Sequence, residues 1–221
     1  MKSEAIMSYR DSSAHSLFTA AILVAVALVS QGFAFAECRK EVGAQCQGAA
    51  LSNAVWRKVD LNGGNFRDTN FEGANLEGSR FKGADLRGAN LKSARLVGSD
   101  LSEANLEGAD LRGANLRNAS LSRAQLTGAI MARAFLEGAD LSYARLNGAD
   151  LTRCNLVGAD LQHADLRGAL LDGSVLNYTN LKQANLTGTS VQRSRIIGAR
   201  LAEAVWIDGK VCSSTSVGAC E

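Results

Sequence analysis

The 221-residue sequence contains no proline, only two histidines and 5% aromatic residues. Without proline every residue keeps a backbone N–H, which suits a fold whose neighbouring strands exchange hydrogen bonds throughout. The scarcity of histidine leaves little material for acid–base catalysis or for a histidine-based metal centre. We therefore expect no catalytic residues, no metal site and no cofactor.

The sequence also lacks a strong charge of either sign and a long apolar run. Its net charge is only +2, so no strong field favours nucleic acid or an anionic membrane as a partner. The apolar run Leu17–Val29 has 13 residues, which is shorter than the roughly 20 that a membrane span needs. We expect no nucleic-acid partner and no stable membrane span in the mature protein.

The first 36 residues read as a leader. The apolar run is followed by the small-x-small motif Ala34-Phe35-Ala36, which is typical of a secretory signal peptide cut before Glu37. A buried helix that caps the fold is the alternative interpretation. The signal peptide predicts export, with the periplasm as the expected compartment and secretion or a thylakoid lumen as the other destinations.

From Leu51 to Val211 the sequence keeps a five-residue period through 33 consecutive pentads. Every fifth residue, here called the centre, is bulky and apolar. The residue two before each centre is nearly always small, the residue just before is often Asn or Asp, and the second residue after is often Gly. A fixed period of this kind indicates stacked structural units rather than one globular core.

A five-residue period suits neither an α-helix nor a simple strand. A helix would carry the centres around its axis, because five is far from a multiple of 3.6. A strand would send successive centres to opposite faces, because its side chains alternate. The chain must instead turn by a fixed amount at every pentad.

The segments ADLRGANLRNASL (109–121) and GADLSYARLNGADL (138–151) resemble the pentapeptide-repeat family. The resemblance covers residues 51–211 and implies an all-β fold, a right-handed quadrilateral parallel β-helix. Each pentad would make a quarter turn, so four pentads would form one coil, and about eight coils would stack at strand spacing, roughly 4.8 Å. The centre and the small residue would then point inward, and the other three side chains outward.

The five cysteines and the export signal together indicate an oxidising compartment. Four of them flank the repeats in two pairs, each eight residues apart: Cys38 with Cys46, and Cys212 with Cys220. Because the two ends of a stack are too distant to be bridged, we expect each pair to form a disulfide in an end cap. Metal binding is the weaker alternative, since the sequence has no CxxC motif.

The expected organisation is a signal peptide (1–36), an N-terminal cap (37–50), the repeats (51–211) and a C-terminal cap (212–221). The fifth cysteine, Cys154, falls at an inward position and is expected to be a buried, unreactive thiol. Asp140 and Asp160 are 20 residues apart and should stack on one face, as a cation site or, more simply, as solvated acids.

Outward residues that are 20 positions apart should form a column along the coils, and one such column departs from the repeat. Two faces mostly carry glycine at the second residue after the centre, but a third carries large polar or aromatic side chains there. The members of this column are Glu103, Arg123, Tyr143, His163 and Gln183. They predict either a binding face for an extended peptide or glycan, or a different turn type that tolerates side chains.

The last coils carry two further features. Four basic residues without a neighbouring acid form a weak basic belt that could meet an anionic glycan or a lipid headgroup: Lys182, Arg193, Arg195 and Arg200. An apolar cluster around Trp206 either lies under the cap or forms a homodimer contact through the C-terminal end.

These observations favour a non-enzymatic exported scaffold or interaction module that binds a protein, peptide or glycan. The resemblance implies a second function, because some members mimic DNA and protect gyrase. That role requires a strongly acidic surface and a cytoplasmic location, and this chain has neither. An enzyme that uses the face with Tyr143 and His163 is a third hypothesis, for which no further catalytic partner is evident.

Overall fold

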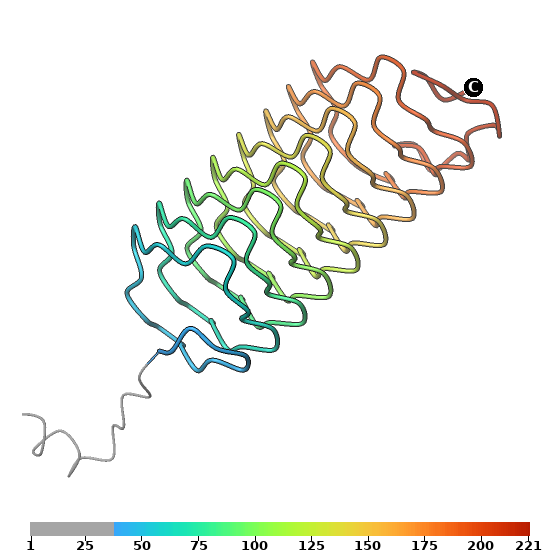
Figure 1. The fold of residues 1–221 in the computed structure, drawn as a ribbon. Helices are drawn as coiled ribbons and strands as arrows, with labels where there is room; N and C mark the ends of the chain where they lie inside the picture. Colours follow the sequence, from blue (N-terminus) through green and yellow to red (C-terminus); the bar gives the residue numbers. More distant parts are fainter. Residues whose placement is uncertain (1–37) are drawn as a thin grey trace, which may run out of the picture. The chain divides into compact units, whose positions relative to one another are not determined.

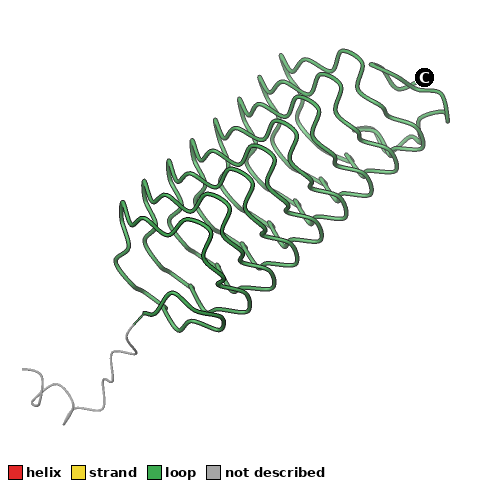
Figure 2. Cartoon of the chain, in the orientation of Figure 1, coloured by secondary structure: helices red, strands yellow, loops and turns green. Residues whose placement is uncertain are grey.

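The computed structural model describes residues 38–221, and Figure 1 shows them winding into a stack of coils along one axis. The predicted signal peptide and its cleavage site before Glu37 lie outside the described residues. No helix and no extended strand occurs within 38–221; the secondary structure consists of turns and single-residue bridges (Figure 2).

The bridges set the register of the coils. Each pairs residue i with residue i + 20 in parallel orientation, from Gln45–Asn65 through to Asn185–Val205. One coil therefore takes 20 residues, or four pentads. The expected right-handed quadrilateral parallel β-helix of about eight coils is confirmed.

The centres and the small residues fill the interior. Every centre from Leu61 to Leu186 is at most 1% exposed, and small residues such as Ala104 are fully buried. Burial of a leucine side chain contributes about 1.5–3 kcal/mol, so a long run of buried centres supplies the main stabilising term. Some of the small positions carry a hydroxyl, which is buried and hydrogen-bonded to the backbone of a neighbouring coil. Thr179 Oγ1, for example, donates to the Leu156 carbonyl at 2.9 Å.

Each pentad forms one side of the coil and ends in a turn of the same type. The N–H of Ala104 donates to the Leu101 carbonyl at 3.1 Å, and Glu103 between them has φ of 59°. A positive φ at the third turn residue together with this hydrogen bond is the signature of a type II turn. Glycine is frequent at this position because it adopts positive φ without steric cost, as Gly108 does at 65°.

The Asn or Asp before each centre closes a second small turn. Asp100 Oδ1 accepts a hydrogen bond from the Ser102 N–H at 2.9 Å. That N–H is the one donor of the pentad that finds no backbone acceptor. The Leu101 N–H donates to the following coil and the Asp100 N–H to the preceding one. The side-chain oxygen therefore completes the hydrogen bonding of the backbone.

This role predicts a difference between two substitutions of Asp100. Asp100→Asn keeps an oxygen at the same place, so its free energy of unfolding should change by no more than about 0.5 kcal/mol. Asp100→Ala leaves the Ser102 N–H without its acceptor and should cost about 1 kcal/mol. Urea denaturation followed by circular dichroism measures both; equal losses would mean that the charge, not the acceptor, matters.

The first coils are filled by aromatic centres. Phe71 packs edge-on against Trp56 and Phe81, with ring centroids 6.0 Å and 6.1 Å away. Gly64 takes the small position beside them because a Cβ there would lie 2.4 Å from the Phe66 ring. This glycine is needed for space, unlike the glycines of the turns.

At the N-terminal end the ladder begins before the predicted first centre, Leu51. The first bridge is Gln45–Asn65, and Cys46 occupies an inward centre position with 2% exposure. Cys38 and Cys46 lie at disulfide distance, with Cα atoms 4.7 Å apart.

At the C-terminal end the chain leaves the parallel ladder and folds back on the last coil. Arg200–Val217 and Val205–Val211 are antiparallel bridges. Val211 is in phase with the centres, yet its exposure is 66%. Cys212 and Cys220 lie at disulfide distance in this segment, with Cα atoms 4.9 Å apart.

Candidate functional site

The outward column uses the same turn as the glycine columns. Arg123, Tyr143 and His163 each have φ of 59°, close to the 65° of Gly128 on a neighbouring side. A different turn type therefore does not explain the column. Residues other than glycine cost roughly 1 kcal/mol or more in this left-handed region, a cost that this column shares with other turn residues such as Lys58 and Arg133.

Three members of the column are stacked on one another. The Arg123 guanidinium carbon lies 5.1 Å from the centre of the Tyr143 ring. The Tyr143 and His163 rings are stacked, with centroids 4.5 Å apart and planes at 19°. Tyr143 is 49% exposed. The coil spacing and these contacts hold a guanidinium, a phenol and an imidazole in one row on the surface.

The other two members make separate contacts. Glu103 Oε1 pairs with Lys82 Nζ at 3.4 Å. Gln183 Nε2 donates to Glu203 Oε2 at 2.8 Å, beside a shallow cavity of about 230 Å³. The structure thus brings Arg123, Tyr143 and His163 together and leaves Glu103 and Gln183 in pairs at either end of them.

The side chain beside the His163 ring is the amide of Gln162 and not an acid. Gln162 Nε2 lies 3.3 Å from His163 Nε2. Asp160, two residues before Gln162, uses Oδ1 to accept the Gln162 N–H at 2.9 Å, and Asp140 does the same for the Ser142 N–H. The two aspartates are therefore turn-closing residues. Residues 38–221 contain no group of three or more His, Cys, Asp or Glu arranged to hold a metal ion.

Other outward carboxylates are neutralised locally by arginine. The Arg87 guanidinium hydrogen-bonded to Asp85 lowers the pKa of that carboxyl, and Arg167 lowers the pKa of Asp165 in the same way. Since the folded-state pKa is lowered, the stability that these pairs contribute is present at neutral pH and is lost as the pH falls through the lowered value. For exposed pairs that contribution is about 1 kcal/mol or less.

Cys154 occupies a small-residue position, two before a centre, in the interior of the coils. Burial raises the pKa of its thiol to about 12, and Sγ donates to the Met131 carbonyl at 2.9 Å. A thiol that stays protonated at physiological pH is a poor nucleophile. The thiol takes the place that a serine hydroxyl takes at other small-residue positions.

The cysteines predict a specific count of reactive thiols. Without reductant, the native protein should incorporate no iodoacetamide, because Cys154 is buried and the other four are paired. In guanidinium chloride it should incorporate one label per chain, measured by intact mass, with Cys154 as the labelled peptide. Several labels after denaturation would show that the end caps are open.

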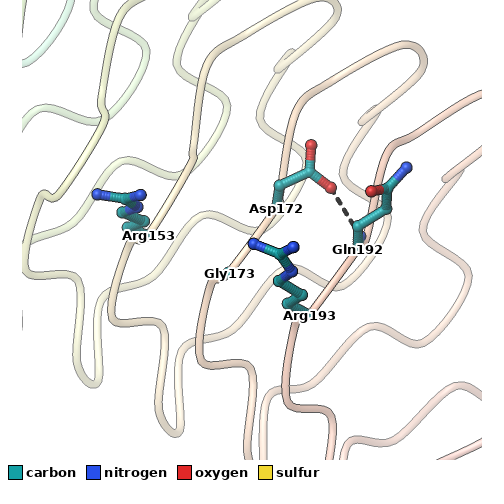
Figure 3. A pocket seen from close by; sticks show the side chains of 5 residues that line it. All are labelled: Arg153, Asp172, Gly173, Gln192 and Arg193. Carbon is teal, nitrogen blue, oxygen red and sulfur yellow. Dashed lines mark hydrogen bonds between the residues drawn. The ribbon is translucent and has the colours of Figure 1, made fainter.

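Sequence reasoning placed Arg193 in the basic belt but missed the cluster around it, which lies half a coil away from the Arg123–Tyr143–His163 stack. Arg153, Asp172, Gly173, Gln192 and Arg193 line a shallow notch of about 240 Å³ (Figure 3). The available signal was the column that contains Arg153, Gly173 and Arg193, in which a glycine interrupts the arginines.

The pentapeptide-repeat family model matches residues 42–78, 79–118, 119–156 and 154–193, with eight copies. The chain belongs to the pentapeptide-repeat family. The earlier resemblance is therefore confirmed, and the matches begin, like the bridge ladder, before Leu51.

Several solved pentapeptide-repeat structures are similar to this chain. HetL, involved in heterocyst differentiation regulation in the cyanobacterium Nostoc sp. strain PCC 7120, is 33% identical; the match covers 77% of this chain and 86% of HetL, with a TM-score of 0.36. A trypsin-treated variant of QnrB1, a plasmid-mediated fluoroquinolone resistance protein, is 21% identical over 68% and 83%, with a TM-score of 0.58. A protein of the Arabidopsis thaliana thylakoid lumen is 22% identical over 82% and 85%, with a TM-score of 0.15.

No curated protein sequence matches the chain. Of the three structures, QnrB1 has the highest TM-score, and its structural similarity supports the fold. At 21% identity it supports the fold alone. The described part of this pentapeptide-repeat protein offers no helical segment with the length and hydropathy of a membrane span.

Proposed function

We propose that this pentapeptide-repeat protein is a non-enzymatic, exported interaction module that binds an extended peptide or glycan through the Arg123–Tyr143–His163 stack. The observation that carries the proposal is the stack itself: three large side chains in left-handed backbone positions and in contact with one another, of which Arg123 and Tyr143 are exposed and His163 is half-buried.

The stack has the properties of a recognition surface. Tyrosine and arginine are enriched among the residues that dominate binding energy at interfaces. Because the coil fixes their spacing and each ring restrains the next, these side chains would lose little conformational entropy when a partner binds. An extended partner that runs along the axis of the coils could contact all three.

The same surroundings argue against turnover. Nucleophilic or general-base catalysis needs a histidine oriented by a third group and placed beside a nucleophile. His163 is in contact with the Tyr143 ring and the Gln162 amide, neither of which is an activated nucleophile or an orienting carboxylate. We therefore favour binding over the alternative of an enzyme on this face.

Charge argues against the DNA-mimic alternative. The first 36 residues carry two basic and two acidic residues, so 22 basic and 20 acidic residues follow them. A surface so nearly balanced does not reproduce the charge of a nucleic acid.

Export is the second part of the proposal and has its own test. The short apolar run and the Ala-Phe-Ala motif predict a mature protein that begins at Glu37. Intact mass of the protein isolated from the exported fraction of its host should correspond to residues 37–221 with two disulfides. A full-length chain in the cytoplasm would contradict export.

The binding face is tested by replacing Arg123, Tyr143 and His163 together with alanine. The variant should fold, because all three side chains point outward, and should lose the partner that the wild type captures from the exported fraction, measured by quantitative mass spectrometry. A matched control replaces Tyr178, which is 65% exposed, and Arg95, and should keep the partner.

An unchanged partner list for the triple variant would refute the proposed face. The C-terminal apolar cluster would then be the next candidate, as a homodimer contact: Ile197 there is 63% exposed, whereas Trp206 is partly buried against the core. Sedimentation velocity of the wild type would test that contact.

A further inference from the structure

The notch lined by Arg153, Gly173 and Arg193 lies on the opposite side of the coil from the Arg123–Tyr143–His163 stack. It exists because Gly173 has no side chain. Gly173 lies between Arg153 and Arg193 in one column, one coil from each. The Arg153 Cγ would lie 3.4 Å from a Cβ on Gly173, so the arginine stem forms one wall of the gap. Figure 3 shows the Arg193 guanidinium reaching back toward Gly173 from the other side.

Both arginines are available to a ligand. Within residues 38–221 neither Arg153 nor Arg193 takes part in an ion pair of the kind that holds Arg87 to Asp85 or Arg167 to Asp165. Both also adopt positive φ, 58° and 59°, in the turn position that is often glycine. The Arg193 guanidinium thus points toward the gap, and Arg153 lines it with the stem of its side chain.

The floor of the notch offers acceptors beside these donors. Asp172 Oδ1 accepts hydrogen bonds from Ser190 Oγ and from the Gln192 N–H, both at 2.6 Å, which fix the carboxylate in place. Its Oδ2 accepts none from the described residues and in Figure 3 points away from Gly173; Asp172 and Gln192 both line the notch. The notch is therefore lined by two arginines without ion pairs in the described part of the chain, one carboxylate held by hydrogen bonds and one amide.

We propose that this notch binds an acidic sugar unit, with its carboxylate on the guanidinium groups and its hydroxyls on Asp172 and Gln192. A guanidinium matches the planar geometry of a carboxylate through two parallel hydrogen bonds. The Asp172 carboxylate would repel a bare anion but accepts hydrogen bonds from hydroxyl groups, which favours a sugar acid over an inorganic ion. Arg133 continues the column one coil beyond Arg153, so a chain of such units could extend along the axis.

The probe is trigalacturonic acid, titrated calorimetrically into the mature protein at low ionic strength. Binding should weaken as salt is added, because the contacts are charged and exposed. Maltotriose, which lacks carboxylates, and sodium sulfate, which lacks hydroxyls, should each bind at least tenfold more weakly. Sulfate binding as tight as that of the sugar acid would overturn the saccharide assignment, and no binding of trigalacturonic acid at millimolar concentration would overturn the site.

Two variants locate the binding. Arg153→Ala with Arg193→Ala should weaken it at least tenfold. Gly173→Asn fills the gap with a residue that tolerates positive φ and should abolish it, whereas Gly113→Asn, in the same column and turn three coils away, should leave it unchanged. Equal effects of the two asparagine variants, or an unchanged affinity in the arginine variant, would place the ligand elsewhere. Since the triple variant of the stack retains the notch, it should still bind the probe.

Discussion

Deletion of the single residue Gly113 is expected to destroy the coils that follow it. Every later centre would move one position out of the interior relative to the coils before the deletion. A buried leucine contributes about 1.5–3 kcal/mol, so no repacking of the outward residues can replace the lost interior. We expect loss of the cooperative thermal transition and rapid proteolysis beyond residue 113.

Removal of a whole coil is the matched control for that deletion. Deletion of residues 94–113 removes 20 residues, Gly113 included, and keeps both the phase and the faces, so the shortened chain should fold cooperatively. Arg112→Ala, beside Gly113, removes an exposed ion pair with Asp110 and should cost less than about 1 kcal/mol. Equal damage from the one-residue and the 20-residue deletion would mean that the period does not determine the fold.

Phe71→Ala is expected to have the largest effect among single substitutions in the first coils. The ring is fully buried and in contact with other aromatic centres, so its removal leaves a cavity that stacked backbone cannot collapse to fill. The expected cost is about 3–5 kcal/mol in the free energy of unfolding, measured by guanidinium denaturation.

Phe135→Ala is the same substitution on the outside of the coil. Phe135 is 41% exposed and lies under the Arg117 guanidinium, 4.8 Å from its carbon. Its loss should cost about 1 kcal/mol or less. Similar costs for the two phenylalanines would contradict the assignment of inside and outside by position in the pentad.

The period was sufficient to predict which residues are inside from Leu61 to Leu186, because a constant register gives each position of the pentad one environment. It failed at the ends, where Val211 keeps the phase but lies on the surface. The pattern could not reveal that departure, since the cap is held by antiparallel pairing to particular residues of the last coil and not by the repeat.

The sequence predicted that the candidate residues form a column, but not that their side chains contact one another. The absence of glycine marked the positions of Arg123, Tyr143 and His163, whereas the contacts between their side chains depend on side-chain conformations that no pattern contains. The notch was missed for a similar reason. Its defining residue, Gly173, looks like any other turn glycine until the arginines on both sides are seen to stand next to it.

The central claim is that the period builds the scaffold while contact between coils builds the binding face. Insertion of one extra coil tests both parts at once: a copy of residues 84–103, with glycine in place of Glu103, placed after Tyr143 in one variant and after Gly83 in another. Both variants should fold with the cooperativity of the wild type, since both keep the phase. Partner capture should be lost only in the first, where the new coil separates Tyr143 from His163. Equal capture by both variants would contradict the assignment of the stack as the binding face.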